Sequence, residues 1–93
     1  MEAVKHKIIS FWLTHFFLRR IAKRYPDFFK KWVCDITDSR LERRVAILRY
    51  YGDDEDKDIH PLKFYKIADK LNTVERNVYL YHQSFINRLI SGV

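Results

Sequence analysis

The stretch IADKLNTVERNV, Ile67–Val78, joins two helical patterns through a short break. Apolar residues at helical spacing precede the break and end at Leu71, and a second set begins at Val78. The small side chain of Ala68 would let two helices cross closely around a three-residue turn. The stretch therefore predicts a helix-turn-helix, and the alternative is an ordinary helical hairpin with a short loop.

The remainder of the chain also has apolar residues at helical spacing. It contains only two glycines and two prolines, which leaves few breakpoints for a sheet protein with many turns. Ser39 and Glu42 have the spacing of a capping box, with Thr37 or Asp38 as further caps near the same helix start. The sequence thus predicts an all-α fold, a five-helix domain with a C-terminal helix-turn-helix. The expected helices span residues 2–25, 27–35, 41–51, 61–71 and 74–90.

The expected buried faces follow from the same spacing. The third helix is expected to bury Leu41, Val45, Leu48 and Tyr51 and to stop at Gly52. Pro61 suits the first turn of the fourth helix, because the first helical position needs no N–H. The fourth and fifth helices are expected to bury Phe64, Ile67, Ala68, Leu71, Val78, Tyr81, Phe85 and Leu89, with His82 at the edge of the core.

The first third of the chain is unusually apolar and basic. Its first helix is apolar on more than one stripe, so it needs cover on more than one side. We therefore divide the chain into residues 1–38, a helical dimerisation or packing segment, and residues 39–93, the helix-turn-helix domain. A homodimer is predicted through residues 8–33. The apolar residues concerned are Ile8, Ile9, Phe11, Trp12, Leu13, Phe16, Phe17, Leu18 and Ile21.

The net charge of +6 favours an anionic partner. Lys and Arg side chains that meet phosphates release counterions, which makes nucleic acid a plausible partner. A basic helix can equally be a solvated face, and a membrane-surface role is weaker because the charges encircle the first helix. The apolar N-terminal run is too short to span a bilayer, and no signal-peptide cleavage site follows it. We expect a cytoplasmic protein with no membrane partner.

Sites for metals, cofactors or catalysis are not predicted. Asp54, Asp56 and Asp58 alternate as calcium ligands do, but Ile59 stands where a calcium loop needs glycine, and Tyr65 where it needs glutamate. An acidic, solvated linker is the better interpretation. The single Cys34 is expected to be a reduced core thiol. No nucleotide-binding glycine loop or catalytic triad pattern appears, so an enzyme is not expected and no cofactor is predicted.

Two segments, LERRVAILRYYG and FYKIADKLNTVERNVYLYHQSFINRL, resemble the promoter-reading region 4 of bacterial sigma factors and related helix-turn-helix regulators. The resemblance covers about residues 39–90. It implies a transcriptional regulator that binds double-stranded DNA and contacts RNA polymerase. Val74 stands where the family places a Ser or Thr cap, and residues 1–38 do not resemble the promoter-melting region. The resemblance therefore points to a small stand-alone regulator of the kind that phages and mobile elements encode.

The candidate DNA-binding residues lie on the last two predicted helices. In a helix-turn-helix, residues at the start of the second helix face the major groove. Arg76 suits guanine, Asn77 or Gln83 suits adenine, and Glu75 can accept from cytosine, while Leu80 suits a thymine methyl. The full set is Glu75, Arg76, Asn77, Tyr79, Leu80 and Gln83 for the groove, and Lys63, Lys66, Lys70 and Arg88 for phosphates. The alternatives are a solvated surface and a protein-binding module whose helix-turn-helix does not bind DNA.

Overall fold

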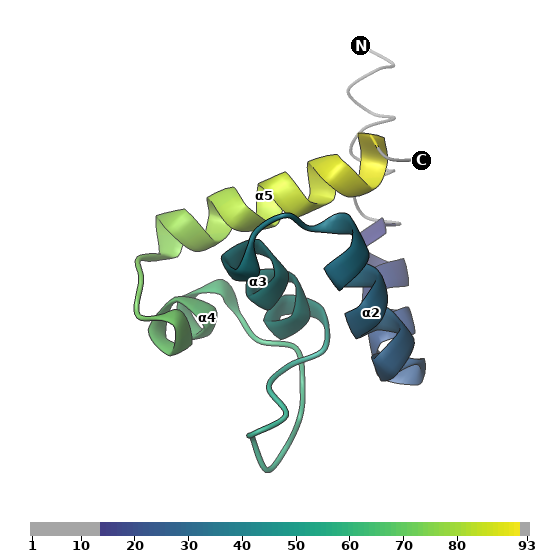
Figure 1. The fold of residues 1–93 in the computed structure, drawn as a ribbon. Helices are drawn as coiled ribbons and strands as arrows, with labels where there is room; N and C mark the ends of the chain where they lie inside the picture. The colour runs from purple at the N-terminus through teal and green to yellow at the C-terminus, as the bar shows by residue number, and fades with distance from the viewer. Residues whose placement is uncertain (1–13, 92–93) are drawn as a thin grey trace.

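The computed structural model describes residues 14–91, and this part of the chain is entirely helical and without strands (Figure 1). Residues 14–24 form a helical segment that precedes the four further helices. The all-α prediction is therefore confirmed for the described residues. The predicted first helix extends beyond them, so Ile8, Ile9, Phe11, Trp12 and Leu13 lie outside the described part. The four further helices are α2 (Pro26–Ile36), α3 (Arg40–Tyr50), α4 (Phe64–Leu71) and α5 (Glu75–Ser91).

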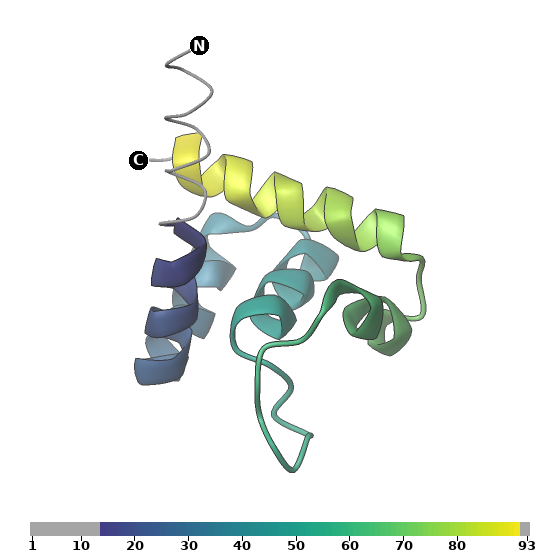
Figure 2. The same ribbon diagram turned by 180° about the vertical axis from the view of Figure 1, so that it is seen from behind.

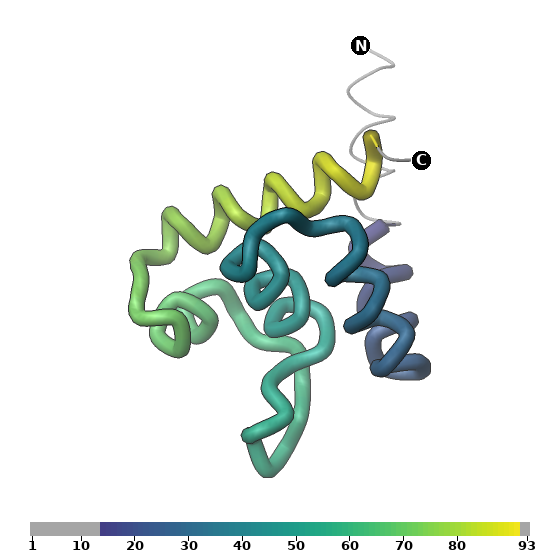
Figure 3. Tube along the Cα trace, in the orientation of Figure 1, coloured from purple at the N-terminus to yellow at the C-terminus, as the bar shows by residue number. Residues whose placement is uncertain are grey.

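Helix α5 lies across α3 and α4 and also contacts α2 (Figure 1). Residues 14–24 run alongside α2, behind it in Figure 1 and in front of it when the molecule is turned (Figure 2). The connection between α3 and α4 projects away from α5, as the backbone trace shows (Figure 3). This arrangement leaves the outer face of α5 uncovered by any other described helix.

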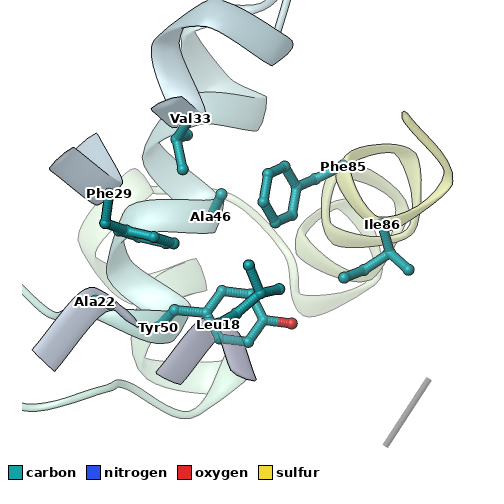
Figure 4. Close-up of a cluster of buried hydrophobic side chains, with 8 residues drawn as sticks. All are labelled: Leu18, Ala22, Phe29, Val33, Ala46, Tyr50, Phe85 and Ile86. Atoms are coloured by element: carbon teal, nitrogen blue, oxygen red, sulfur yellow. The ribbon is translucent and has the colours of Figure 1, made fainter. Parts of the chain in front are cut away.

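One core cluster ties the N-terminal helices to α3 and α5 (Figure 4). Phe29 and Phe85 are fully buried in it, and the ring of Tyr50 lies between them with 1% of its surface exposed. Because Leu18 and Ala22 join these side chains of α2, α3 and α5, residues 14–36 share a core with the rest of the chain. The cluster contains Leu18, Ala22, Phe29, Val33, Ala46, Tyr50, Phe85 and Ile86.

The second core cluster holds α4 and the start of α5 against α3. Ile67 and Ala68 of α4 meet Val78 of α5, as the sequence pattern predicts. Helix α3 serves both clusters, because Ala46 and Tyr50 face one cluster and Val45 and Leu48 face the other. The second cluster contains Val45, Leu48, Leu62, Ile67, Ala68 and Val78.

Helix α4 begins at Phe64, so the predicted start at Pro61 is wrong. The backbone at Lys63 is extended, with φ −72° and ψ 156°. The N–H of Leu62 donates to the carbonyl of Leu48 at 3.0 Å, and Arg49 Nη1 donates to the carbonyl of Leu62 at 3.1 Å. These bonds to α3 hold the segment straight and delay the helix by three residues.

Helix α3 starts at the predicted cap, but the residue that it buries at its C-terminal end differs from the prediction. Ser39 is the N-cap and its hydroxyl accepts from the N–H of Glu42 at 3.5 Å. The reciprocal half of the capping box is replaced, because the Glu42 carboxylate is buried and bonds to Arg88. Leu41 is 43% exposed, and Tyr50 takes the fully buried place expected for Tyr51, which is partly buried. The predicted burial of Leu41 is therefore wrong.

Cys34 is exposed, so the prediction of a core thiol is wrong. Phe29 and Val33 lie four residues apart and occupy the inward face of α2. The next residue in sequence is rotated by about 100° from that face. Burial of Val33 thus places Cys34 on the outside.

Candidate nucleic-acid interface

The turn between α4 and α5 comprises residues 72–74. Asn72 adopts a left-handed conformation, with φ 53° and ψ 50°, which asparagine tolerates better than most residues. The N–H of Thr73 donates back to the carbonyl of Ala68 at 3.0 Å, so this C-terminal end of α4 is closed by its own backbone. The Thr73 hydroxyl in turn accepts from the side-chain amide of Asn77 at 3.0 Å. The turn is therefore fixed by bonds on both sides.

The two helices cross steeply at this turn, with α4 seen almost end-on while α5 runs across the view (Figure 1). Ala68 is 5% exposed, and Ile67 and Val78 are completely buried between the helices and α3. A larger side chain at Ala68 would have to displace its buried neighbours. The short connection and the close packing together fix the orientation of α5 relative to α4.

The ten candidate DNA-binding residues are all exposed. Those on the first turns of α5 form one outer surface, in which Leu80 is 61% and Tyr79 50% exposed. Tyr79 packs its ring on Phe64 at 4.4 Å between centroids, and its hydroxyl donates to Glu75 at 3.4 Å. Farther along α5, the amide of Gln83 donates to Asn87 at 3.1 Å. The structure thus brings Glu75, Arg76, Asn77, Tyr79, Leu80 and Gln83 together along α5.

The cations of the candidate set fall into two groups. Among residues 14–91, Lys63, Lys66 and Arg76 have no ion pair and no side-chain hydrogen bond. Arg88 bonds to Asp38 at 2.8 Å and to Glu42 at 3.0 Å. These two carboxylates hold Arg88 toward the start of α3. Lys63, Lys66 and Arg76 are therefore the cations best placed to meet an external anion.

Lys70 is engaged by the connection between α3 and α4. Its ammonium group lies 2.9 Å from Asp53 and 3.1 Å from Asp56. The hydrogen bond from the Glu55 N–H and the bond from Lys70 lower the pKa of Asp53. The same connection is held on its other side, where Asp54 accepts from Lys30 at 2.6 Å and from the hydroxyl of Tyr51 at 2.7 Å. The acidic segment is largely exposed, as the sequence predicts, and its ion pairs also attach it to Lys30 and Lys70.

A buried polar chain links α5 to the opposite side of the core. The hydroxyl of Tyr50 lies 2.7 Å from His82 Nε2 and 3.1 Å from His15 Nδ1. A hydroxyl carries one hydrogen, so it can donate to only one of the two imidazoles and must accept from the other if both are hydrogen-bonded. Burial, with smaller effects of Arg49 and His15, lowers the pKa of His82 from 6.5 to about 4. The neutral His82 therefore anchors α5 at ordinary pH, in a more buried position than the predicted core edge.

Val74 is a surface residue that sequence reasoning placed at the start of the last helix but not among the candidate DNA-binding residues. It is 61% exposed and directly precedes α5, beside the candidate reading positions. Its carbonyl accepts from the N–H of Asn77 at 3.1 Å, which starts the helix without a side-chain cap. The signal in the sequence was the valine at a position where a Ser or Thr cap is usual.

Comparison with known proteins gives no further guide to the site. No protein-family model, no curated protein and no solved structure shows a significant match to the chain. Among the described helices, none combines the length and the apolar character that crossing a membrane requires. The described residues also contain no group of three or more His, Cys, Asp or Glu side chains that could hold a metal ion.

Proposed function

We propose that the protein is a sequence-specific DNA-binding regulator of transcription that reads double-stranded DNA with α5. The observation that carries the proposal is the uncovered start of α5. There Arg76, which forms no ion pair with a described residue, stands beside exposed polar and apolar side chains. Val78, on the inward face of this part of α5, packs in the same core cluster as residues of α4. A rigid helix that presents an arginine and adaptable neighbours is suited to the major groove.

The position of each cation indicates whether it would contact a base or a phosphate. Arg76 lies in the first turn of α5, where its guanidinium can meet the edge of a guanine through two hydrogen bonds. Lys63 and Lys66 lie at the start of α4. If α5 occupies the major groove of a duplex, these two lysines can reach only the phosphate backbone of that duplex. A contact with RNA polymerase and a place in the cytoplasm accord with the resemblance to region 4 of sigma factors.

Replacement of Arg76 and of Lys66 should affect binding differently. We expect Arg76→Ala to cost about 1–3 kcal/mol on a selected duplex and to relax preference at one base position. Lys66→Ala should weaken selected and scrambled duplexes alike, because phosphate contacts carry no sequence information. The measurement is a set of titrations of both folded variants on both duplexes. If Arg76→Ala binds both duplexes as the parent does, α5 is not the reading element.

The loop carboxylates should compete with DNA phosphates for Lys70. In the variant Asp53→Asn/Asp56→Asn the ammonium group loses both of its negatively charged partners, so we expect binding of random duplex about two- to fivefold tighter at low salt. The variant Glu55→Gln/Asp58→Asn removes the same charge from the same loop without touching an ion pair of Lys70, and it serves as the control. An equal gain in both variants would show that general repulsion, and not access to Lys70, limits binding.

A second candidate function is self-association or protein binding through the apolar end of the molecule. An apolar groove of about 450 Å³ lies between residues 14–18, α2 and the end of α5. Phe16 is 64% exposed, Phe17 61% and Ile90 55%, which is unusual for such large apolar side chains on one surface. The groove is lined by Thr14, Phe16, Phe17, Leu18, Trp32, Leu89 and Ile90. This surface supports the predicted homodimer, with the docking of another protein as the alternative.

The substitution Phe16→Glu tests self-association. A carboxylate in the groove would have to be desolvated on dimerisation, so sedimentation should shift from dimer to monomer at equal protein concentration. Tyr65→Glu is the matched control, because Tyr65 is 49% exposed on α4, outside residues 8–33 and outside the groove lining. A parent protein that sediments as a monomer at high concentration would contradict the homodimer.

A further inference from the structure

A second, differently built cleft lies on the side of the molecule away from the start of α5. It is bounded by residues 14–24 on one side and by the connection after α3 on the other, with the end of α3 between them (Figure 2). Its volume is about 620 Å³, which is in the range of small-molecule sites. The cleft is lined by Arg19, Lys23, Pro26, Tyr50, Tyr51, Ile59, His60 and Pro61.

One wall of the cleft is cationic. Arg19 and Lys23 lie one helical turn apart and so project from the same face. Across the cleft, His60 Nδ1 lies 2.8 Å from the carbonyl of Asp58. A carbonyl only accepts, so Nδ1 donates its hydrogen to the loop and is not free for an anion. Arg19 and Lys23 are therefore the two nitrogen groups that would face an anion.

The positive charge of this wall has no partner within residues 14–91. The nearby loop carboxylates are held elsewhere, Asp54 by Lys30 and both Asp53 and Asp56 by Lys70. Neither Arg19 nor Lys23 forms an ion pair with a described residue. Burial and then the charge of Arg19 lower the pKa of Arg49, so like charges already crowd this side of the core. An incoming anion would relieve that repulsion.

The opposite wall is mainly apolar. Ile59 is 43% exposed, and Pro61 and the ring of Tyr51 line the same side of the cleft. Tyr51 is held in place by its bond to Asp54 and by Lys30, whose ammonium group lies 4.3 Å from the ring centroid. A ring or hydrocarbon body can pack on this wall while a charged group faces the cations.

We propose that this cleft binds a small phosphate-bearing organic molecule. Arg19 and Lys23 hold the phosphate, since a guanidinium offers paired donors to its oxygens and an ammonium adds a compact charge. The side formed by Tyr51, Ile59 and Pro61 covers the organic body. The site does not depend on DNA binding by α5.

The test is a titration of the complete, isotope-labelled chain followed through its backbone amide signals. The probes are adenosine monophosphate, inorganic phosphate and adenosine. Adenosine monophosphate should shift amides around the cleft, namely residues 19–26 and 50–61, inorganic phosphate should shift the same amides more weakly, and adenosine should leave them in place. If neither phosphate probe shifts these amides at millimolar concentration, the proposal is wrong.

Matched variants distinguish specific binding in the cleft from a general attraction of the anion to the basic protein. Arg19→Gln/Lys23→Gln should bind adenosine monophosphate at least about tenfold more weakly, because two charge-assisted contacts are lost. Arg20→Gln/Lys31→Gln removes the same net charge outside the cleft lining and should bind within about twofold of the parent. Equal weakening of both variants would overturn the proposal. So would cleft shifts caused by a short random duplex but not by adenosine monophosphate, because the anion would then be a nucleic-acid backbone.

Discussion

A change from pH 7 to pH 5 is expected to lower the free energy of unfolding by about 2 kcal/mol through His82 alone. The imidazole is buried against Tyr50, and its pKa falls from 6.5 to about 4 in the folded chain. In the unfolded chain it titrates near 6.5, so between these two pKa values the unfolded state binds the additional proton. The stabilisation is complete above pH 6.5 and is lost as the pH falls toward 4.

The measurement is chemical denaturation of the parent and of His82→Gln at both pH values. Glutamine cannot titrate, and its amide can still bond to the hydroxyl of Tyr50. The parent should therefore lose about 2 kcal/mol more than the variant between pH 7 and pH 5. Burial also lowers the pKa of His15, whose titration acts in the same direction in both proteins. Equal losses in parent and variant would mean that His82 is protonated without cost in the folded chain.

Replacement of Gly52 by alanine is expected to destabilise the fold by about 3 kcal/mol. Gly52 has a φ of 123°, a conformation that a side chain strains. An added Cβ would also collide with the carbonyl oxygen of His60 and would lie only 2.9 Å from the His60 nitrogen. The backbone on both sides is fixed, because the Gly52 N–H donates to Ile47 and the Leu62 N–H to Leu48.

Thermal or chemical unfolding of Gly52→Ala measures this effect, with Lys57→Ala as the control. Lys57 is exposed in the same connection and has no ion pair with a described residue, so its replacement should change stability by less than about 0.5 kcal/mol. If Gly52→Ala is as stable as the control, the tight approach of residue 52 to residue 60 is not a feature of the folded chain in solution.

Helical spacing predicted several of the inward and outward residues of α4 and α5, but it missed Ile86, which is fully buried. Ile67, Ala68, Val78 and Phe85 are buried, whereas all ten candidate DNA-binding residues are exposed. A period of 3.6 residues fixes the faces of a helix once one inward residue is known. The existence of these two helices, and the face that each turns toward the core, were therefore encoded in the local sequence.

Long-range contacts explain what the sequence did not predict. The rule that proline suits a first helical turn failed at Pro61 because Leu62 bonds to α3, thirteen and more residues earlier in the chain. Tyr50 and Tyr51 are adjacent and chemically identical, so spacing alone could not decide which one meets His82. The engagement of Lys70 by Asp53 and Asp56 likewise depends on how the connection folds back. The residues in these contacts are distant in the chain, so no short sequence pattern predicts them.

The most direct test of DNA binding by this protein is the salt dependence of its affinity for a random duplex. Lys63 and Lys66 form no ion pair with a described residue and are the two cations proposed to meet phosphates. Each phosphate neutralised contributes about −0.9 to the slope of log K against log salt, so we expect binding at low salt with a slope of about −2. Absence of binding at low salt, or an affinity that does not change with salt, would contradict the account and leave protein binding as the better function for this fold.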